Sequence, residues 1–314
     1  RVGTHLEGKV VAITGGARGI GRAIALAAAQ EGASVVVADY GGGVTGGEVS
    51  TEAADAVVAE IESAGGKATS VAVDVSTVEG GKAVTQAAVE TFGRIDGLVC
   101  SAGIAINRYI YEVTEQEWDA VIAVHLKGHF TAVQAAAEVM MEQKSGHIVT
   151  VGSGAFTGMP NALAYATAKA GILGFTWSVA YALQPWGITC NCLVPSAATR
   201  MSDSMYSAAG KLSKRFGETI QSDLAEGTYR DPANVAPMGV YLLSDLSNDI
   251  TGQAFRAQGY EIARLGSSAF SWTAMTSNGR FELDDIAARL PVELGPDFSM
   301  LPIPWPEPKD RRRP

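Results

Sequence analysis

Tyr165 and Lys169 are the two residues in this sequence whose types and spacing could do chemistry together. They stand four positions apart, so on a helix they share one face. A phenol ionises near pH ~10, and a neighbouring ammonium group lowers that pKa towards neutral pH. Such a phenol can take a proton from an alcohol while the hydride leaves, or return one to a ketone. The pair therefore predicts acid-base chemistry, although a plain surface pair on a helix has the same spacing.

A glycine-rich turn near the start of the chain predicts a dinucleotide-binding site. Residues 10–13 read as a short buried strand, which runs into TGGARGIG at residues 14–21 and then into an apolar helical stretch. Glycines in this turn allow a pyrophosphate to approach the helix N-terminus closely. Asp39 ends the next strand-like run, 18 residues beyond Gly21, where dinucleotide folds place the acid that bonds the adenosine ribose.

Short apolar strands alternate with helices to about residue 258, which predicts an α/β fold. We expect one Rossmann-type, doubly wound parallel sheet in a three-layer αβα domain over residues 1–260, followed by a C-terminal extension at 261–314 with a Pro-rich arm. The polar segment 196–230 is a candidate lid over substrate or, alternatively, a solvent-facing insertion. The other expected helices are 51–64, 78–92, 115–142 and 162–184, and the other expected strands are 69–73, 95–100, 147–151 and 188–194.

Composition narrows the class of protein further. The apolar share of 47% can fill a large core, and the net charge of 24 − 33 = −9 argues against a nucleic-acid partner. No run of 18 apolar residues or leader pattern is present, so we expect no membrane association. The three cysteines, Cys100, Cys190 and Cys192, show no metal-ligand or disulfide spacing and suggest a reducing compartment, the cytoplasm.

Together these segments resemble the short-chain dehydrogenase/reductase family over roughly residues 8–260. TGGARGIG fits the family's TGxxxGxG turn, and YATAK at residues 165–169 fits its YxxxK pair. Ser153 lies upstream of Tyr165, where the family carries a catalytic serine. The resemblance implies an enzyme that interconverts a secondary alcohol and a ketone with NAD or NADP.

The resemblance also implies a role for each matching residue. Tyr165 would be the general acid/base, Lys169 would lower its pKa and bond the nicotinamide ribose, and Ser153 would donate a hydrogen bond to the substrate oxygen. The residues at the family's cofactor-binding positions are Gly15, Arg18, Gly19, Ile20, Gly21, Asp39, Asp74, Val75, Ser101, Ala102, Gly103, Tyr165, Lys169, Pro195 and Thr199.

Three positions depart from the family pattern. Ser153 lies one residue closer to Tyr165 than usual, so either the loop is shorter or Gly152 takes the serine's place, and we expect the former. His125 stands where the family carries an Asn that holds a proton-relay water, and it would serve either as a relay that titrates near pH ~6.5 or as a structural residue. Residues 100–103, CSAG, replace the family's NNAG.

Cofactor choice depends on two opposed charges. Asp39 would bond a free 2′-hydroxyl and repel a 2′-phosphate, whereas Arg18 occupies a position that favours phosphate in some relatives. Because the carboxylate is the charge closer to the ribose, we predict NAD, with NADP the less favoured cofactor.

Within the family, the loop at 41–47, VHLKG at 124–128 and the tail beyond 258 resemble the (3R)-hydroxyacyl-CoA dehydrogenases of the peroxisomal multifunctional enzyme type 2 group and its bacterial single-domain relatives. This implies a hydroxyacyl-CoA or hydroxysteroid substrate. Met201, Met205 and Tyr206 in the lid suit a bulky apolar substrate or, equally, packing against the core. The alternatives are an enzyme for small aryl, alicyclic or terpenoid alcohols and a non-catalytic dinucleotide-binding regulator. The resemblance further implies a homo-oligomer, a tetramer or a dimer.

Overall fold

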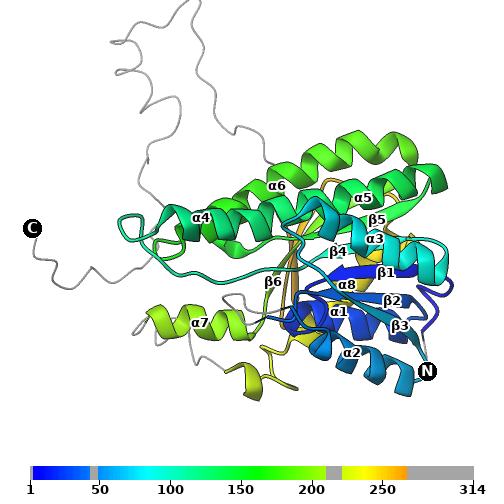
Figure 1. The fold of residues 1–314 in the computed structure, drawn as a ribbon, viewed down its shortest axis with the longest axis horizontal. Helices are drawn as coiled ribbons and strands as arrows, with labels where there is room; N and C mark the ends of the chain where they lie inside the picture. Colours follow the sequence, from blue (N-terminus) through cyan, green and yellow to red (C-terminus); the bar gives the residue numbers. More distant parts are fainter. Residues whose placement is uncertain (1–2, 43–48, 210–220, 267–314) are drawn as a thin grey trace, which may run out of the picture. The chain divides into compact units, whose positions relative to one another are not determined.

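Strands and helices alternate along the chain (Figure 1). The computed structural model describes residues 3–42, 49–209 and 221–266, without the side chains of 205–209. In these ranges the strands are β1 Val10–Thr14, β2 Ser34–Asp39, β3 Lys67–Ala72, β4 Gly97–Cys100, β5 Gly146–Val151, β6 Ile188–Ser196, β7 Ala254–Gln258 and β8 Glu261–Arg264. The α-helices are α1 Gly19–Gln30, α2 Glu52–Ser63, α3 Val78–Phe92, α4 Glu115–Ile122, α5 Gly128–Gln143, α6 Leu163–Leu183, α7 Arg200–Ala209 and α8 Ala236–Leu243.

All these strands form one sheet, in the order β3-β2-β1-β4-β5-β6-β7-β8. Seven of them are parallel, and β8 pairs antiparallel with β7. The strand order reverses its direction between β1 and β4, whose last residues, Thr14 and Cys100, are paired. The doubly wound sheet predicted from the sequence is therefore confirmed. Its antiparallel edge, β8, was not predicted and lies within the range expected to be an extension.

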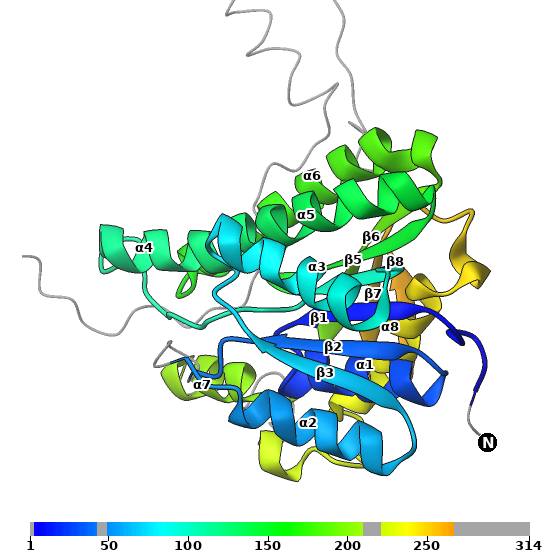
Figure 2. The ribbon, with the colours of Figure 1, turned by 45° about the vertical axis from the view of Figure 1, so that its right-hand side comes forward.

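Helices cover both faces of the sheet, as Figure 2 shows from the side. Alternate residues of β1 point to opposite faces, so Val11 and Ile13 pack with α1, α2 and α8 in one apolar cluster. Val10 and Ala12 pack with α3, α5 and α6 in the other. This burial on two sides explains why the strands are continuous apolar runs.

The helix predicted over 115–142 is helical throughout but changes type in the middle. It begins with a capping box, in which the Glu117 backbone N–H donates to Thr114 Oγ1 over 3.2 Å and the Thr114 N–H donates back to Glu117 Oε2 over 3.1 Å. Residues Ala123–Lys127 then form a π-helical turn between α4 and α5. A π turn holds one more residue than an α turn and often occurs at functional sites. His125 lies at its centre.

The segments outside the sheet and its covering helices are described only in part. The candidate lid contains α7, which the polar composition of 196–230 did not predict, and residues 210–220 lie outside the described ranges. The same holds for most of the glycine-rich loop, 43–48, and for 267–314 in the predicted extension. Among the described helices, none combines the length and the apolar character needed to cross a membrane.

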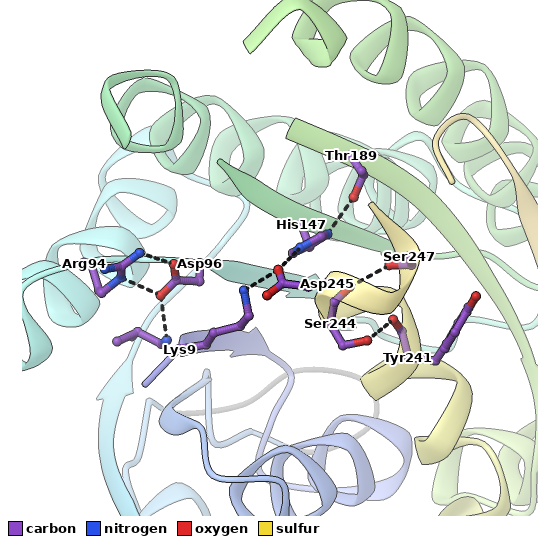
Figure 3. Close-up of polar contacts among 10 residues, drawn as sticks. Lys9, Arg94, Asp96, His147, Thr189, Tyr241, Ser244, Asp245 and Ser247 are labelled. Atoms are coloured by element: carbon purple, nitrogen blue, oxygen red, sulfur yellow. Dashed lines mark hydrogen bonds and ion pairs between the residues drawn. The ribbon is translucent and has the colours of Figure 1, made fainter. Parts of the chain in front are cut away.

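The amino edge of the sheet carries a network of polar contacts (Figure 3). Lys9 Nζ lies 2.7 Å from Asp245 Oδ1, and His147 Nε2 lies 3.7 Å from the same oxygen. The other ring nitrogen of His147, Nδ1, is 2.9 Å from Thr189 Oγ1. These four residues line a cavity of about 490 Å³.

Candidate active site

The candidate catalytic residues lie at the opposite, carboxyl edge of the sheet. The ends of β1 and β4 are joined there by Thr14, whose Oγ1 accepts hydrogen bonds from the backbone N–H groups of Ser101, at 3.2 Å, and Ala102, at 3.3 Å. The reversal in strand order between β1 and β4 opens a crevice in doubly wound sheets, and this is where their ligands bind.

The turn between β1 and α1 has no room for side chains at its glycines. Gly15 has φ +67°, and a Cβ atom there would lie 2.7 Å from the backbone N of Ala102. A Cβ atom at Gly21 would overlap the carbonyl oxygen of Gly15. Gly19, with φ +53°, faces the Thr199 side chain. This close-packed turn at a helix N-terminus fits the pyrophosphate of a dinucleotide.

Asp39 lies beside this turn at the end of β2. Its carboxylate accepts hydrogen bonds from the backbone N–H groups of Ala17, at 3.1 Å, and Gly41, at 2.8 Å. Arg18 Nη1 donates to the carbonyl of Gly42 over 2.9 Å, so the arginine reaches the loop that follows Asp39. Arg200, on α7, lies close enough to both residues to be affected by their charges. Burial and the charge of Arg18 lower the pKa of Arg200, and the charge of Asp39 opposes this shift.

Tyr165 and Ser153 meet where β5 ends and α6 begins. Tyr165 is 8% exposed, and its hydroxyl lies close enough to the side chain of Ser153 for the serine to lower the pKa of the phenol. A Cβ atom at Gly152 would instead meet the Cys192 sulfur at 2.8 Å, so position 152 faces β6 and position 153 faces the tyrosine. Of the two alignments left open by the sequence, the geometry favours Ser153.

The pKa of Tyr165 differs from the sequence-based expectation. Burial raises the pKa of the phenol, and the hydrogen bond with Ser153 lowers it only in part. We expected Lys169 to bring this pKa below its ordinary value, whereas in the structure burial raises it. The lysine Nζ lies 5.5 Å from the centre of the tyrosine ring.

Lys169 is almost completely buried and has no carboxylate partner among the described residues. Its Nζ donates to the carbonyl oxygen of Val151, at the end of β5, over 2.7 Å. Burial lowers the pKa of this ammonium group to about 8, because desolvation disfavours the charged form. Lys169 is therefore held in place by one neutral acceptor.

His125 packs against Tyr165 from the π turn. The two ring centres lie 5.0 Å apart at an angle of 86°, an edge-to-face arrangement. His125 Nε2 lies 2.7 Å from the carbonyl oxygen of Ile104, whereas Nδ1 is buried without a partner in the described residues. Burial and the charge of Lys169 lower the pKa of His125 to about 3. The expectation that this imidazole titrates near pH ~6.5 is therefore wrong, because a fully buried ring is held neutral.

The remaining predicted cofactor residues lie at the carboxyl edge or next to it. Asp74 and Val75 follow β3, and the Asp74 carboxylate accepts from the backbone N–H of Ser76 at 2.9 Å. Pro195 lies near the end of β6. Thr199 precedes α7 and exchanges hydrogen bonds with Ser202, which places it beside Gly19. Ile20 lies in the first turn of α1 and packs against the core.

An apolar wall adjoins Tyr165. Its buried members lie on α4 and at the start of α6. Partly buried side chains complete the wall: Ile104 and Ile106 from the loop after β4, Trp118 from α4, Ala155 and Met159 from the segment after β5, and Met201 from α7. Met201 was expected either to contact a bulky substrate or to pack against the core, and in the structure it packs against this cluster. The side chains of Met205 and Tyr206, predicted with it, lie outside the described residues.

Comparison of the sequence and the structure with known proteins shows the family of this chain. The model of the family described as short chain dehydrogenase matches residues 9–209. The 3-oxoacyl-[acyl-carrier-protein] reductase FabG of Thermotoga maritima is 37% identical over 258 residues, which cover 81% of this chain and 98% of that protein. A crystal structure of a short chain dehydrogenase from Mycobacterium avium is 35% identical and matches with a TM-score of 0.75, over 91% of this chain and 94% of that one.

The chain belongs to the short-chain dehydrogenase family. A second relative is the peroxisomal multifunctional enzyme type 2 of Drosophila melanogaster, which is 40% identical over 200 residues; these cover 63% of this chain and 33% of that much longer protein. As a short-chain dehydrogenase, the protein is an oxidoreductase that acts on CH–OH groups and binds a nicotinamide dinucleotide. The glycine turn, Asp39 and the unpartnered Nδ1 of His125 fit such a group.

Sequence reasoning missed several residues of the site. Arg200 is the clearest case, because the sequence gives no sign that α7 brings it to Asp39 and Arg18. Trp118 belongs to an amphipathic helix whose apolar face reads as ordinary core. Asn161, with its buried and unpartnered Oδ1, lies in the turn before α6. A polar residue just ahead of the YxxxK helix could have drawn attention to this turn.

Proposed function

We propose that this short-chain dehydrogenase interconverts the hydroxyl and oxo groups of a (3R)-hydroxyacyl-CoA, or of a hydroxysteroid, with NAD as its cofactor. The observation that carries the proposal is the contact of Ser153 with Tyr165 beside the buried ammonium group of Lys169. These are the groups that alcohol oxidation needs: a hydrogen-bond donor for the substrate oxygen, a proton acceptor and a fixed positive charge.

In this proposal, Tyr165 takes the proton of the substrate hydroxyl during oxidation and returns it during reduction. Ser153 holds the substrate oxygen against the phenol. The ammonium group of Lys169 stabilises the phenolate that forms, because opposite charges about 4–6 Å apart favour the ionised state. When bound, the nicotinamide dinucleotide accepts or donates the hydride.

We propose that His125 acts beside the tyrosine as an uncharged imidazole. A ring whose pKa is about 3 carries no proton charge at neutral pH, so it cannot act as an imidazolium relay. Its Nε2 lies 2.7 Å from the carbonyl oxygen and 3.1 Å from the backbone N of Ile104, and we assign the tautomer in which Nε2 donates to the shorter contact. The lone pair of Nδ1 is then left to accept a hydrogen bond from a water or a cofactor hydroxyl. His125 would thus orient the proton path in place of the family's asparagine.

The preference for NAD follows from Asp39. Its carboxylate is fixed by two backbone N–H groups at the end of β2, where a 2′-phosphate would meet its charge. Arg18 and Arg200 oppose this preference, because both carry positive charge close to Asp39. We therefore expect NAD to bind more tightly than NADP, and Asp39→Ala to reverse the order. A wild-type preference for NADP would contradict this assignment.

The apolar wall supports a large substrate. Trp118, Met159 and Met201 come from three separate segments and leave apolar side chains partly buried next to Tyr165. A bulky acyl chain or a steroid can cover them, whereas a small alcohol leaves them in contact with water.

The test is dinucleotide reduction by the purified full chain. The substrates are a (3R)-hydroxyacyl-CoA, the same acyl group on an acyl carrier protein, a 17β-hydroxysteroid and a small aryl secondary alcohol. Selective turnover of the CoA thioester or the steroid supports the proposal. Selective turnover of the carrier-protein thioester or the small alcohol would contradict the proposed substrate class and assign the enzyme to that substrate instead. Dinucleotide binding without any turnover would favour a non-catalytic regulator.

We also propose a cytoplasmic homotetramer or dimer whose catalytic domain ends near residue 260, with 261–314 as an extension. Phe130, on the helix α5, is 43% exposed, and a large apolar side chain on an outer helix supports pairing through that face. Light scattering of the purified protein tests the assembly, and a monomer at micromolar concentration would contradict it.

A further inference from the structure

β5 extends one residue beyond the end of its neighbour β4. The last residue of β4, Cys100, pairs with Thr150, and β5 continues for one more residue, Val151. The N–H of Gly152 donates to Leu193 on β6. Because successive residues of a strand face alternate neighbours, the N–H and C=O of Val151 point towards β4. The pairing of Cys100 with Thr150 sets the N–H of Val151 against the carbonyl oxygen of Cys100, whereas the carbonyl oxygen of Val151 lies beyond the last residue of β4 and needs another donor.

Two side chains contact the backbone of Val151 from the same side. His129 Nε2, from α5, accepts a hydrogen bond from the backbone N–H of Val151 over 3.3 Å. Lys169 Nζ, from α6, donates to the carbonyl oxygen of Val151 over 2.7 Å. One residue of β5 thus joins a histidine outside the candidate catalytic set to the candidate catalytic lysine.

His129 has one tautomer that satisfies its surroundings. The ring is 2% exposed, and burial together with the charge of Lys169 lowers its pKa well below the ordinary value, so it is neutral. Since Nε2 accepts from Val151, Nδ1 carries the proton. The ring also hydrogen-bonds the backbone of His125, one turn earlier in the π segment. A neutral ring with one donor and one acceptor connects the π turn to the end of β5.

We propose that His129 is a positioning residue for Lys169 and Ser153: by holding Val151, it sets the place of the carbonyl that anchors the ammonium group and of the serine two residues later. This rests on the proposed function, in which those two groups act with Tyr165. His129 touches neither substrate nor cofactor, and it acts through the peptide group of Val151.

The proposal predicts a shift in the pH dependence as well as a loss of rate. If Val151 moves, Lys169 lies less favourably beside Tyr165 and stabilises the phenolate less. Alcohol oxidation requires the tyrosine to accept a proton, so kcat rises with pH as the phenol ionises. Loss of the histidine therefore moves the pH of half-maximal kcat upward.

The test compares two buried histidines at opposite ends of β5: His129 contacts its carboxyl end, and His147 lies in the strand near its amino end. His129→Phe removes the contact with Val151, and His147→Phe removes the contact with Thr189 at the amino end. We expect kcat to fall about ten- to a hundredfold in the first variant, with an upward pH shift of about half a unit or more. His147→Phe should lower the melting temperature and leave the pH profile in place. Equal pH profiles in wild type and His129→Phe would overturn the proposal.

A conservative variant and a spectrum make the test independent of folding. His129→Gln keeps an acceptor close to the position of Nε2 and should restore most of the rate; a rate as low as that of the Phe variant would contradict the acceptor role. In the wild-type protein labelled with ¹⁵N at imidazole, His129 should show the Nδ1–H tautomer. An Nε2–H tautomer would overturn the contact itself. This spectrum does not depend on turnover, so it separates a failure of the inference from a failure of the proposed function.

Discussion

A lysine and a histidine lie close together at each edge of the sheet, and the two edges treat them differently. At the amino edge, Lys9 is paired with the carboxylate of Asp245, which is 69% exposed, and the same oxygen lies near His147. At the carboxyl edge, Lys169 is 4% exposed, donates to a carbonyl oxygen, has no carboxylate partner among the described residues, and shares its surroundings with the buried His125. The first lysine has its charge neutralised, and the second has it desolvated.

This difference is what separates a structural charge from one that can take part in a reaction. Lys9 and its partner satisfy one another near solvent, where such pairs stabilise a protein by at most about 1 kcal/mol. Lys169 is held in an unfavourable environment that lowers its pKa to about 8, and the rest of the fold must stabilise it there. A cavity alone does not mark the site: the one of about 490 Å³ lies at the amino edge, among groups that are already paired.

The largest expected difference between the edges is in the rate. Lys169→Met should lower kcat about 10²- to 10⁴-fold, because the phenolate of Tyr165 loses its stabilising charge. Lys9→Met, which removes the same group from the other edge, should leave kcat within about twofold of wild type. Steady-state kinetics of both variants measure this. An equal loss of kcat in the two variants would contradict the view that only the lysine at the carboxyl edge takes part in the reaction.

The second difference is in stability against pH. The folded pKa of Lys169, about 8, lies below its ordinary value of 10.5, so between these values the unfolded chain binds more protons and the stability of the wild type rises with pH. Lys169→Met lacks this dependence. It should be the more stable protein by roughly 3 kcal/mol below pH 8 and should lose this advantage by about 1.4 kcal/mol per pH unit above it. Urea unfolding at several pH values measures the difference, and a constant difference would contradict the burial argument.

The third prediction concerns the packing of the carboxyl edge. A Cβ atom at Gly103 would overlap the ring of His125, so Gly103→Ala should destabilise the protein by about 1–3 kcal/mol and slow turnover. Gly174 lies in α6 with open space where its Cβ atom would be. Gly174→Ala is the matched control and should stabilise the helix by up to about 1 kcal/mol. If the two alanine variants unfold at the same temperature, His125 is not packed as described.

The smallest effect is expected from the ion pair of the amino edge. Asp245→Asn removes the charge that Lys9 faces, and because the carboxylate is mostly exposed, the loss should be at most about 1 kcal/mol. The pKa of Asp245 is lowered first by its hydrogen bond with Lys9, so the small stabilisation is present at neutral pH and is lost as pH falls through the folded pKa. Thermal unfolding at pH 7 and at pH 3 checks the sign. A large loss at neutral pH would show that this edge also carries a buried, functional charge.

The sequence predicted those parts of the site that short segments determine by themselves. The turn from β1 into α1 needs glycines at Gly15 and Gly21 for steric reasons, and Tyr165 and Lys169 share a face because one helix carries both. The alternation of strands and helices likewise fixes a doubly wound sheet, since parallel strands need covered faces.

The parts that the sequence did not predict depend on burial and on contacts between distant segments. The neutral state of His125 follows from a fully buried ring, which no spacing reveals. Arg200, on α7, is far from Asp39 in the sequence, and only the fold brings it within the electrostatic influence of that carboxylate. His129 looks like any helix histidine until its contact with the backbone N–H of Val151 is seen. The short strand β8 was missed because its four residues are all exposed, which leaves no apolar pattern.

The most direct test of the central claim compares two tyrosines of the same helix. Tyr165 is 8% exposed and Tyr181 is 80% exposed, both on α6. With the substrate that the wild type oxidises best, Tyr165→Phe should lose at least about 10²-fold in kcat while its affinity for NAD stays within about threefold, and Tyr181→Phe should behave as wild type. Turnover by Tyr165→Phe at the wild-type rate would contradict the assignment of the proton transfer to this residue.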